Sequence, residues 1–215
     1  MKDLKAIRGA HILSEMVAEG EHEHQDFKYS ISDARKIARS ISAFANNDGG
    51  RLLIGVKDNG VIAGVRNEED IFVVEQAAER YCRPPQHLDF RAYRLEGSVR
   101  VIVAEIPKAE TRPVEVVEER GILKAYYRVA DENIAAHPLM VRAWRIAAGS
   151  EDAAPLDERH YTLAALYADG SGPADERHAA VAMRISTDTA ADLIARLVAA
   201  GVISFTFDGT RFILA

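Results

Sequence analysis

A helix, a glycine turn and a short apolar strand follow one another in the N-terminal half and constrain the fold more than any other part of this 215-residue chain. Ile37, Ile41 and Phe44 recur at helical spacing, which predicts an amphipathic helix over residues 33–45. After the glycine turn, residues 51–56 are short, apolar and β-branched, as in a buried strand. This order predicts an amphipathic helix, then a turn, then a buried strand.

The segments around this block predict further helices and strands. Asp58-Asn59-Gly60 predicts a hairpin turn, because Asn-Gly accepts the positive φ angles of tight primed turns, and residues 61–65 would be the returning strand. The other elements expected in the first 150 residues are helices at 2–19, from Asn67 to Pro84 and at 138–149, and strands at 25–29, 88–95, 99–106, 114–117 and 122–129.

The last 65 residues differ from the rest in charge and in pattern. Residues 149–156 are small, acidic and proline-containing, which is typical of a linker. Helices at 158–169, 175–184 and 187–200, followed by a β-hairpin, give the order of a winged-helix domain over 157–215. Ten acids against five bases in residues 151–215 argue against duplex reading by the third helix and favour dimerisation or partner docking.

Composition excludes several classes of protein. With 27 Lys and Arg against 33 Asp and Glu, the net charge of −6 excludes a strongly basic nucleic-acid binder but not a local basic patch. Cys82 is the single cysteine, so an internal disulfide and a CxxC zinc site are excluded, and a reducing cytoplasm is expected. No apolar run approaches the roughly 18 residues of a membrane helix, so no membrane partner is expected.

Several short motifs between about residues 8 and 145 carry a resemblance to a known family. They are Glu21, Asp26-Phe27-Lys28, Ser42-Ala43-Phe44-Ala45-Asn46, Gly49-Gly50, Leu53-Ile54-Gly55-Val56-Lys57-Asp58, Gly64, Pro113 and Tyr126-Tyr127-Arg128-Val129. In these motifs the chain resembles the AlbA_2 family, also called Schlafen AlbA_2 or divergent AAA-4. The resemblance implies an α/β (α+β) fold with a mixed sheet over residues 1–148, before the winged-helix-like tail, and nucleic-acid binding in transcriptional regulation.

The resemblance also implies a three-carboxylate site. In vertebrate Schlafens a related core resembles a metal-dependent ribonuclease, and its acids correspond to Glu21, Asp26 and Asp58 here, with Asp26 standing where Glu is usual. Such acids could hold Mg²⁺ or Mn²⁺, which prefer oxygen ligands, while Lys28 would stabilise charge on the phosphorane. The alternative is that these acids are ordinary surface charges or partners of neighbouring cations.

Basic residues near these motifs are candidates for phosphate contacts. If they share a face they form a phosphate-tracking strip, and its members would be Lys28, Arg35, Lys36, Arg39, Arg51 and Lys57. Arg128, after two tyrosines on a predicted strand, is a further candidate, and Tyr127 could stack on a base, although one of the two tyrosines must face the core. The alternative for all of them is a normal mixed surface.

Three functions follow from these patterns. The first is a nucleic-acid-binding protein, DNA or RNA, that acts in transcriptional regulation. The second is a divalent-metal-dependent endoribonuclease, and the third is a protein-interaction module with an acidic tail and a possible homodimer. ATP is not expected as a cofactor, because the chain lacks GxxxxGK[ST] and Gly49-Gly50 follows a helix instead of opening one.

Overall fold

The computed structural model of the chain describes residues 7–65, 69–95, 99–151, 154–168 and 172–215. They divide into two compact units: an N-terminal unit that runs to Ala135, and a C-terminal unit from Ala136 that also takes in residues 111–113. The helix α4 (Pro138–Ala147), which the sequence places in the first domain, lies in the C-terminal unit. Its Leu139 is part of the C-terminal core, so the boundary lies about a dozen residues before the expected linker.

A five-stranded mixed sheet forms the centre of the N-terminal unit, which confirms the predicted fold class. β2 pairs parallel with β3, and β1 pairs parallel with β5, while the two remaining pairings are antiparallel. The strand order is β1 (Ile7–Arg8), β5 (Asp89–Arg94), β6 (Arg100–Ile106), β3 (Gly50–Ile54) and β2 (Gln25–Lys28).

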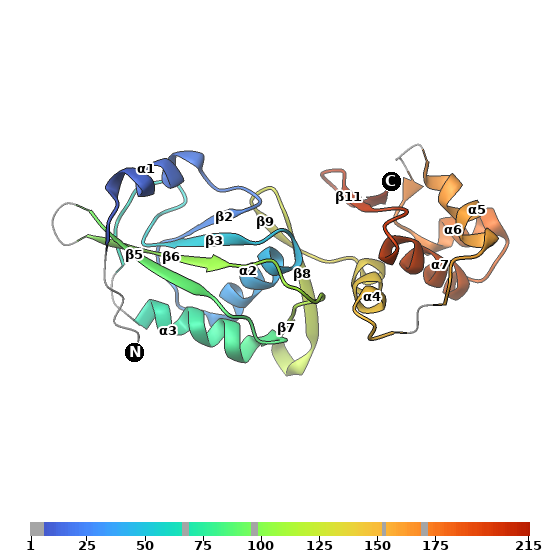
Figure 1. The fold of residues 1–215 in the computed structure, drawn as a ribbon, viewed down its shortest axis with the longest axis horizontal. Helices are drawn as coiled ribbons and strands as arrows, with labels where there is room; N and C mark the ends of the chain where they lie inside the picture. Colours follow the sequence, from blue (N-terminus) through green and yellow to red (C-terminus); the bar gives the residue numbers. More distant parts are fainter. Residues whose placement is uncertain (1–6, 66–68, 96–98, 152–153, 169–171) are drawn as a thin grey trace. The chain divides into compact units, whose positions relative to one another are not determined.

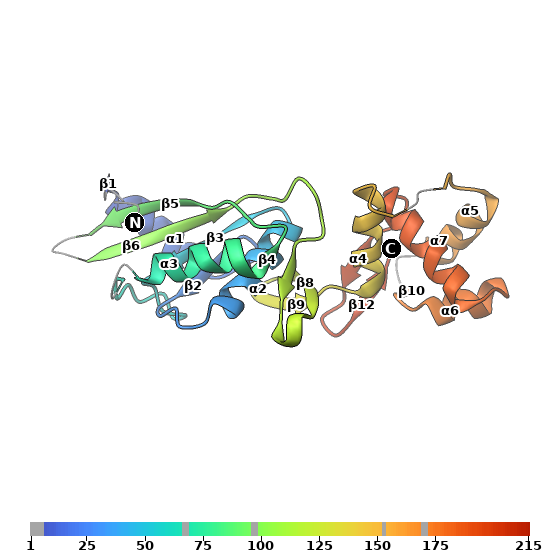
Figure 2. The ribbon, with the colours of Figure 1, turned by 90° about the horizontal axis from the view of Figure 1, so that it is seen from below.

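Helices cover both faces of this sheet. α1 (Ala10–Glu19) covers one face, and α2 (Ala34–Asn46) and α3 (Glu69–Gln76) cover the other, as Figures 1 and 2 show. Side chains of β3 alternate between the two cores: Leu53 packs on the side of α1, whereas Leu52 and Ile54 pack on the side of α2. The predicted strand is therefore buried on both faces, as its continuous apolar run indicated.

A second, antiparallel sheet packs against α2. Two buried side chains of α2 hold it there: Ser42 Oγ donates to Val114 O at 2.7 Å, and Asn46 Nδ2 donates to Val114 O and Tyr126 O, both at 2.9 Å. These two residues of the family motif thus have a structural role. The strand order is β4 (Cys82–Arg83), β7 (Glu115–Val117), β8 (Leu123–Val129) and β9 (Glu132–Ala135).

The backbone bends sharply after β3, and the predicted hairpin is shorter than expected. Gly55 has φ +101°, and a Cβ at this position would lie 2.7 Å from a backbone atom of Gly64. The carbonyl of Gly55 accepts the N–H groups of Ala63 and Gly64, each at 2.9 Å. The returning strand at 61–65 is consequently reduced to a single bridge between Val56 and Ile62.

In the described residues of the C-terminal unit, three further α-helices and a small sheet follow α4. Its core includes Leu163, Tyr167, Leu193 and Ile194. The sheet adds one short strand, β10, to the expected hairpin. The elements are α5 (Glu158–Ala164), a 3₁₀ turn (Ala165–Tyr167), β10 (Gly172–Pro173), α6 (Glu176–Met183), α7 (Thr187–Ala199), β11 (Phe205–Phe207) and β12 (Phe212–Leu214).

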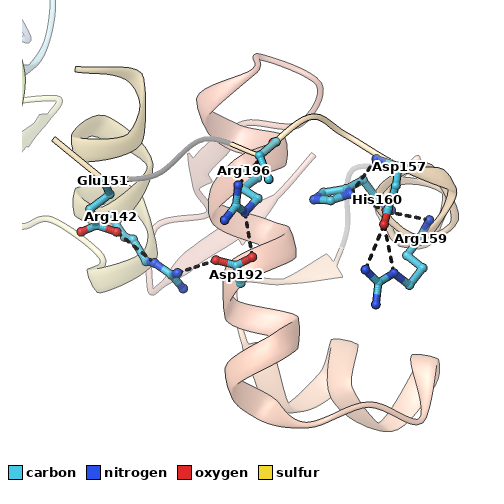
Figure 3. A network of polar contacts seen from close by, with 8 residues as sticks. Arg142, Glu151, Asp157, Arg159, His160, Asp192 and Arg196 are labelled. Carbon is cyan, nitrogen blue, oxygen red and sulfur yellow. Dashed lines mark hydrogen bonds and ion pairs between the residues drawn. The ribbon is translucent and has the colours of Figure 1, made fainter. Parts of the chain in front are cut away.

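Neighbouring elements enclose α7, the helix that would read a duplex in a winged-helix domain. Asp192 of α7 pairs with Arg142 of α4 and with Arg196 one turn further along α7 (Figure 3). From Thr189 to Ala199 every side chain is buried or half-buried. Asp192, one of the ten acids counted in residues 151–215, therefore forms internal ion pairs, and little of α7 is available to enter a groove of DNA.

Candidate nucleic-acid interface

Asp26, the second of the predicted acids, lies on β2 and is only 3% exposed. Its Oδ2 atom is 2.7 Å from Lys28 Nζ and accepts from Ser40 Oγ at 3.3 Å, and its Oδ1 atom is 3.7 Å from the guanidinium of Arg128. Burial by itself would raise the pKa of Asp26, but a hydrogen bond from Glu21 and the charges of Lys28 and Arg128 outweigh it and lower that pKa. Asp26 is thus a carboxylate held between two internal cations.

Glu21, the first predicted acid, lies beside Asp26. Its Oε1 atom accepts the backbone N–H of Phe27 at 2.9 Å, and its carboxyl group hydrogen-bonds to Asp26. Burial, and then the hydrogen bond to Asp26, raise the pKa of Glu21 from its ordinary 4.5 to about 7. Below about pH 7 Glu21 is therefore mostly protonated and donates a hydrogen bond to the carboxylate of Asp26.

The third predicted acid, Asp58, is exposed in the turn after Val56. Nowhere in the described parts of the chain do three His, Cys, Asp or Glu side chains come together so that they could hold a metal ion. The oxygens of Asp26 already contact Lys28, Ser40 and Arg128, which leaves little room for a divalent cation between the acids. As placed, Glu21, Asp26 and Asp58 do not fit a Mg²⁺ or Mn²⁺ site, and only the first two are brought together.

Arg128 does not serve as a surface contact, which corrects the sequence-based interpretation. The residue is 1% exposed, with its guanidinium group 4.9 Å from the ring centroid of Phe44. It donates to Asn133 Oδ1 at 2.9 Å and to the carbonyl oxygen of Gln25 at 3.2 Å. A guanidinium with these internal partners cannot reach a phosphate, and its position follows from strand alternation, because Arg128 and the buried Tyr126 share one side of β8.

The other predicted cations do not form one continuous strip. Lys28 pairs with Asp26, and Arg51 pairs with Glu19 and donates to Gln25 Oε1 at 2.6 Å. Lys36 and Lys57 are exposed, and the Lys57 ammonium group lies 5.1 Å from the ring centroid of Tyr29. The predicted set therefore contains two cations in internal pairs, Lys28 and Arg51, and two exposed cations, Lys36 and Lys57.

Arg35 and Arg39 line an open groove of about 430 Å³ between α2 and the β7–β8 connection. The groove also contains Lys124 and Tyr126 of β8, and Lys124 is a cation that the sequence analysis missed. Strand alternation could have found it, because Lys124 lies two residues before Tyr126 and so shares its side of β8. The structure thus joins two of the predicted cations to a third from a distant part of the sequence.

Glu118 holds one of these cations in place. Arg39 donates through Nε and Nη2 to the two carboxylate oxygens of Glu118, both at 2.7 Å, and Tyr126 donates its hydroxyl to Oε1 at 2.5 Å. The hydrogen bond from Arg39 lowers the pKa of Glu118, whereas burial and the contact with Glu118 raise that of Tyr126 to about 12. All three groups therefore keep their ordinary charge states at neutral pH.

Comparison with known proteins places the chain in a family. The model of the family "Schlafen, AlbA_2" matches residues 21–137, more than half of the sequence, and the chain belongs to this family. This membership points to a nucleic-acid-related function. The solution structure of the N-terminal domain of a RecG-related protein from Nitrosomonas europaea aligns with a TM-score of 0.39 and 16% identity, over 71% of this chain and 97% of that domain.

No curated protein shows significant sequence similarity to the chain. Among the helices that the structure describes, none has the length and apolar character needed to cross a bilayer.

Proposed function

We propose that the N-terminal unit binds nucleic acid through its phosphate groups. One observation carries this proposal: Arg35, Lys36, Lys57 and Lys124 form no ion pair with any carboxylate of the described residues, although acids outnumber bases in the whole chain. Unneutralised cations on the surface are the groups that contact phosphates in such complexes. The family membership of the chain supports the same function.

We expect the full chain to bind RNA or DNA oligonucleotides with an affinity that falls steeply with salt. Release of counterions from about three phosphate contacts lowers the association constant roughly tenfold or more between 50 and 200 mM salt. Fluorescence anisotropy with labelled oligonucleotides at several salt concentrations measures this slope. An affinity that is independent of salt, or no binding to RNA and DNA at low salt, would refute the proposal.

The metal-dependent ribonuclease is a prediction that the arrangement of the acids does not favour. Because Asp58 is exposed and apart from any group of three ligands in the described chain, we expect the Asp58→Ala variant to behave like the wild type. The measurement is incubation of structured RNA with each protein and Mn²⁺. Cleavage by the wild type that Asp58→Ala abolishes would show that a carboxylate site forms after all.

The role in transcriptional regulation and the homodimer also stay predictions. The enclosed position of α7 supports a C-terminal unit that does not read duplex DNA, so we place phosphate contacts in the N-terminal unit alone.

A further inference from the structure

The groove between α2 and the β7–β8 connection combines features that suit an unpaired nucleotide. Its volume of about 430 Å³ lies within the range of small-ligand sites, so the groove can enclose one nucleotide but not a duplex. Arg35 and Arg39 contribute from α2, and Lys124 and Tyr126 from β8. These four residues share the groove with three acids, so the state of each charged group decides what the groove can bind.

Arg39 is held rigidly and still faces solvent. Two hydrogen bonds to Glu118 fix the edge of its guanidinium group, which lies 5.6 Å from the ring centroid of Tyr126. The side chain is nevertheless 40% exposed. A planar guanidinium in a fixed orientation is a surface on which a nucleobase can stack, and only bases outside a duplex expose the face that this contact needs.

Two other cations are available for phosphates. The guanidinium of Arg35 lies 5.4 Å from the ring centroid of Tyr81, and its buried Nε atom has no hydrogen-bond partner among the described residues. The ammonium group of Lys124 lies 5.7 Å from the ring of Tyr126. Ile122, which also lines the groove, is 62% exposed and offers an apolar contact for a base or a sugar.

The acids of the groove are largely engaged by the protein itself. Asp33 caps α2 by accepting the backbone N–H groups of Arg35 and Lys36, and Glu118 accepts from Arg39 and Tyr126. Glu119 is exposed and makes no ion pair with the described residues. Backbone N–H groups do not neutralise the exposed carboxylate of Asp33, so the charges outside ion pairs are the two cations Arg35 and Lys124 and the two carboxylates of Asp33 and Glu119.

From this arrangement we infer that the groove is the binding site for single-stranded nucleic acid, with a base on Arg39 and Ile122 and phosphates on Arg35 and Lys124. The inference rests on the proposed function and adds to it the site and the strand type. Sequence-independent binding is expected, because the contacts involve a stacking surface and phosphates and no hydrogen-bond readout of base edges.

Anisotropy titrations of the full chain with a labelled 12-nucleotide single-stranded RNA, and with the same sequence as a duplex, test this site. We expect the double variant Arg35→Ala/Lys124→Ala to bind the single strand about tenfold more weakly and to reduce the salt slope by about 1.4, since two phosphate contacts are lost. The matched control is Arg91→Ala/Lys108→Ala, which removes the same charge from exposed positions outside the groove and should stay within about twofold of the wild type.

A second variant is expected to bind more tightly, and a partly unfolded protein could not produce that result. Glu119→Gln removes a surface carboxylate of the groove that does not cap a helix, and it should tighten binding about twofold, whereas Glu110→Gln, at an exposed position outside the groove, should leave binding unchanged. Salt-dependent binding with equal affinities for the two double variants, or no tightening in Glu119→Gln, would overturn the groove site and leave the proposed function intact. Equal binding of duplex and single strand would overturn the strand type, and no binding by the wild type would refute the proposed function itself.

Discussion

Replacing Arg128 with methionine is expected to lower the free energy of unfolding by about 3 to 5 kcal/mol. The guanidinium group donates to two backbone carbonyl oxygens, of His22 and Gln25, and to Asn133, and it lies 3.7 Å from Asp26. Methionine fills similar apolar volume over Phe44, but it removes a buried cation beside Asp26 and the donor to Asn133 Oδ1, and it leaves the carbonyl oxygens of His22 and Gln25 with only their backbone donors. Chemical denaturation monitored by circular dichroism measures the loss.

The control for this prediction is Lys57→Met, which removes an exposed cation and should change the free energy of unfolding by no more than about 0.5 kcal/mol. Arg128→Lys supplies a second readout, because it keeps the charge but loses the fork of donors. We expect it to be less stable than the wild type and yet to bind nucleic acid with the same salt slope. A reduced slope would mean that Arg128 contacts phosphates, contrary to its burial.

Glu21→Gln is expected to make the protein more stable than the wild type above pH 7 and equally stable near pH 4.5. Because the pKa of Glu21 is raised from 4.5 to about 7 in the folded state, the unfolded chain loses this proton first as the pH rises. The wild type therefore loses stability between pH 4.5 and 7, and the loss is complete above pH 7. Glutamine cannot ionise, and its amide can still donate to Asp26 while its oxygen accepts from Phe27.

The expected gain at pH 8 is about 1 to 2 kcal/mol, less than the full shift would give, since the half-buried carboxyl group retains some contact with water. Thermal or chemical unfolding at several pH values measures it. The pKa of Asp26 is shifted in the opposite direction, downward from 3.8. The stability that the ionised Asp26 contributes is therefore lost only when the pH falls below 3.8, outside the range from pH 4.5 to 8 in which the two proteins are compared. Glu23→Gln, an exposed neighbour, is the control, and parallel curves for wild type and Glu21→Gln would contradict the raised pKa of Glu21.

Elements whose side chains repeat at a regular spacing were predictable from the sequence. The helix expected at 33–45 is α2, Ala34–Asn46, capped by Asp33, and the four strands expected between residues 88 and 129 are β5 to β8. Four short strands, β1, β4, β9 and β10, were missed, because two to four residues carry no measurable period. The start expected at Asn67 for the helix that ends at Pro84 lies outside the described residues.

The candidate site was less predictable, because its residues are charged and charge alone does not indicate burial. Arg39 and Lys124 are 85 positions apart and meet in one groove, whereas Arg35 and Arg51, much closer in sequence, have different surroundings. Alternation on β8 could have placed Arg128 inside and Lys124 beside Tyr126. The pairing of Arg128 with Asp26 was not predictable from alternation, because it depends on the parallel contact of β2 with β3 and on the position of β8 over α2.

The sequence by itself determined the local elements, the family and the mixed α/β class, since helical and strand periodicities depend on neighbours a few residues away. Only the tertiary structure decided which charged groups are available to a ligand. A cation's availability depends on the carboxylates and rings that come near it from distant segments: Glu118 holds Arg39, Asp26 holds Lys28 and Arg128, and Arg35 and Lys124 form no ion pair with a carboxylate of the described chain.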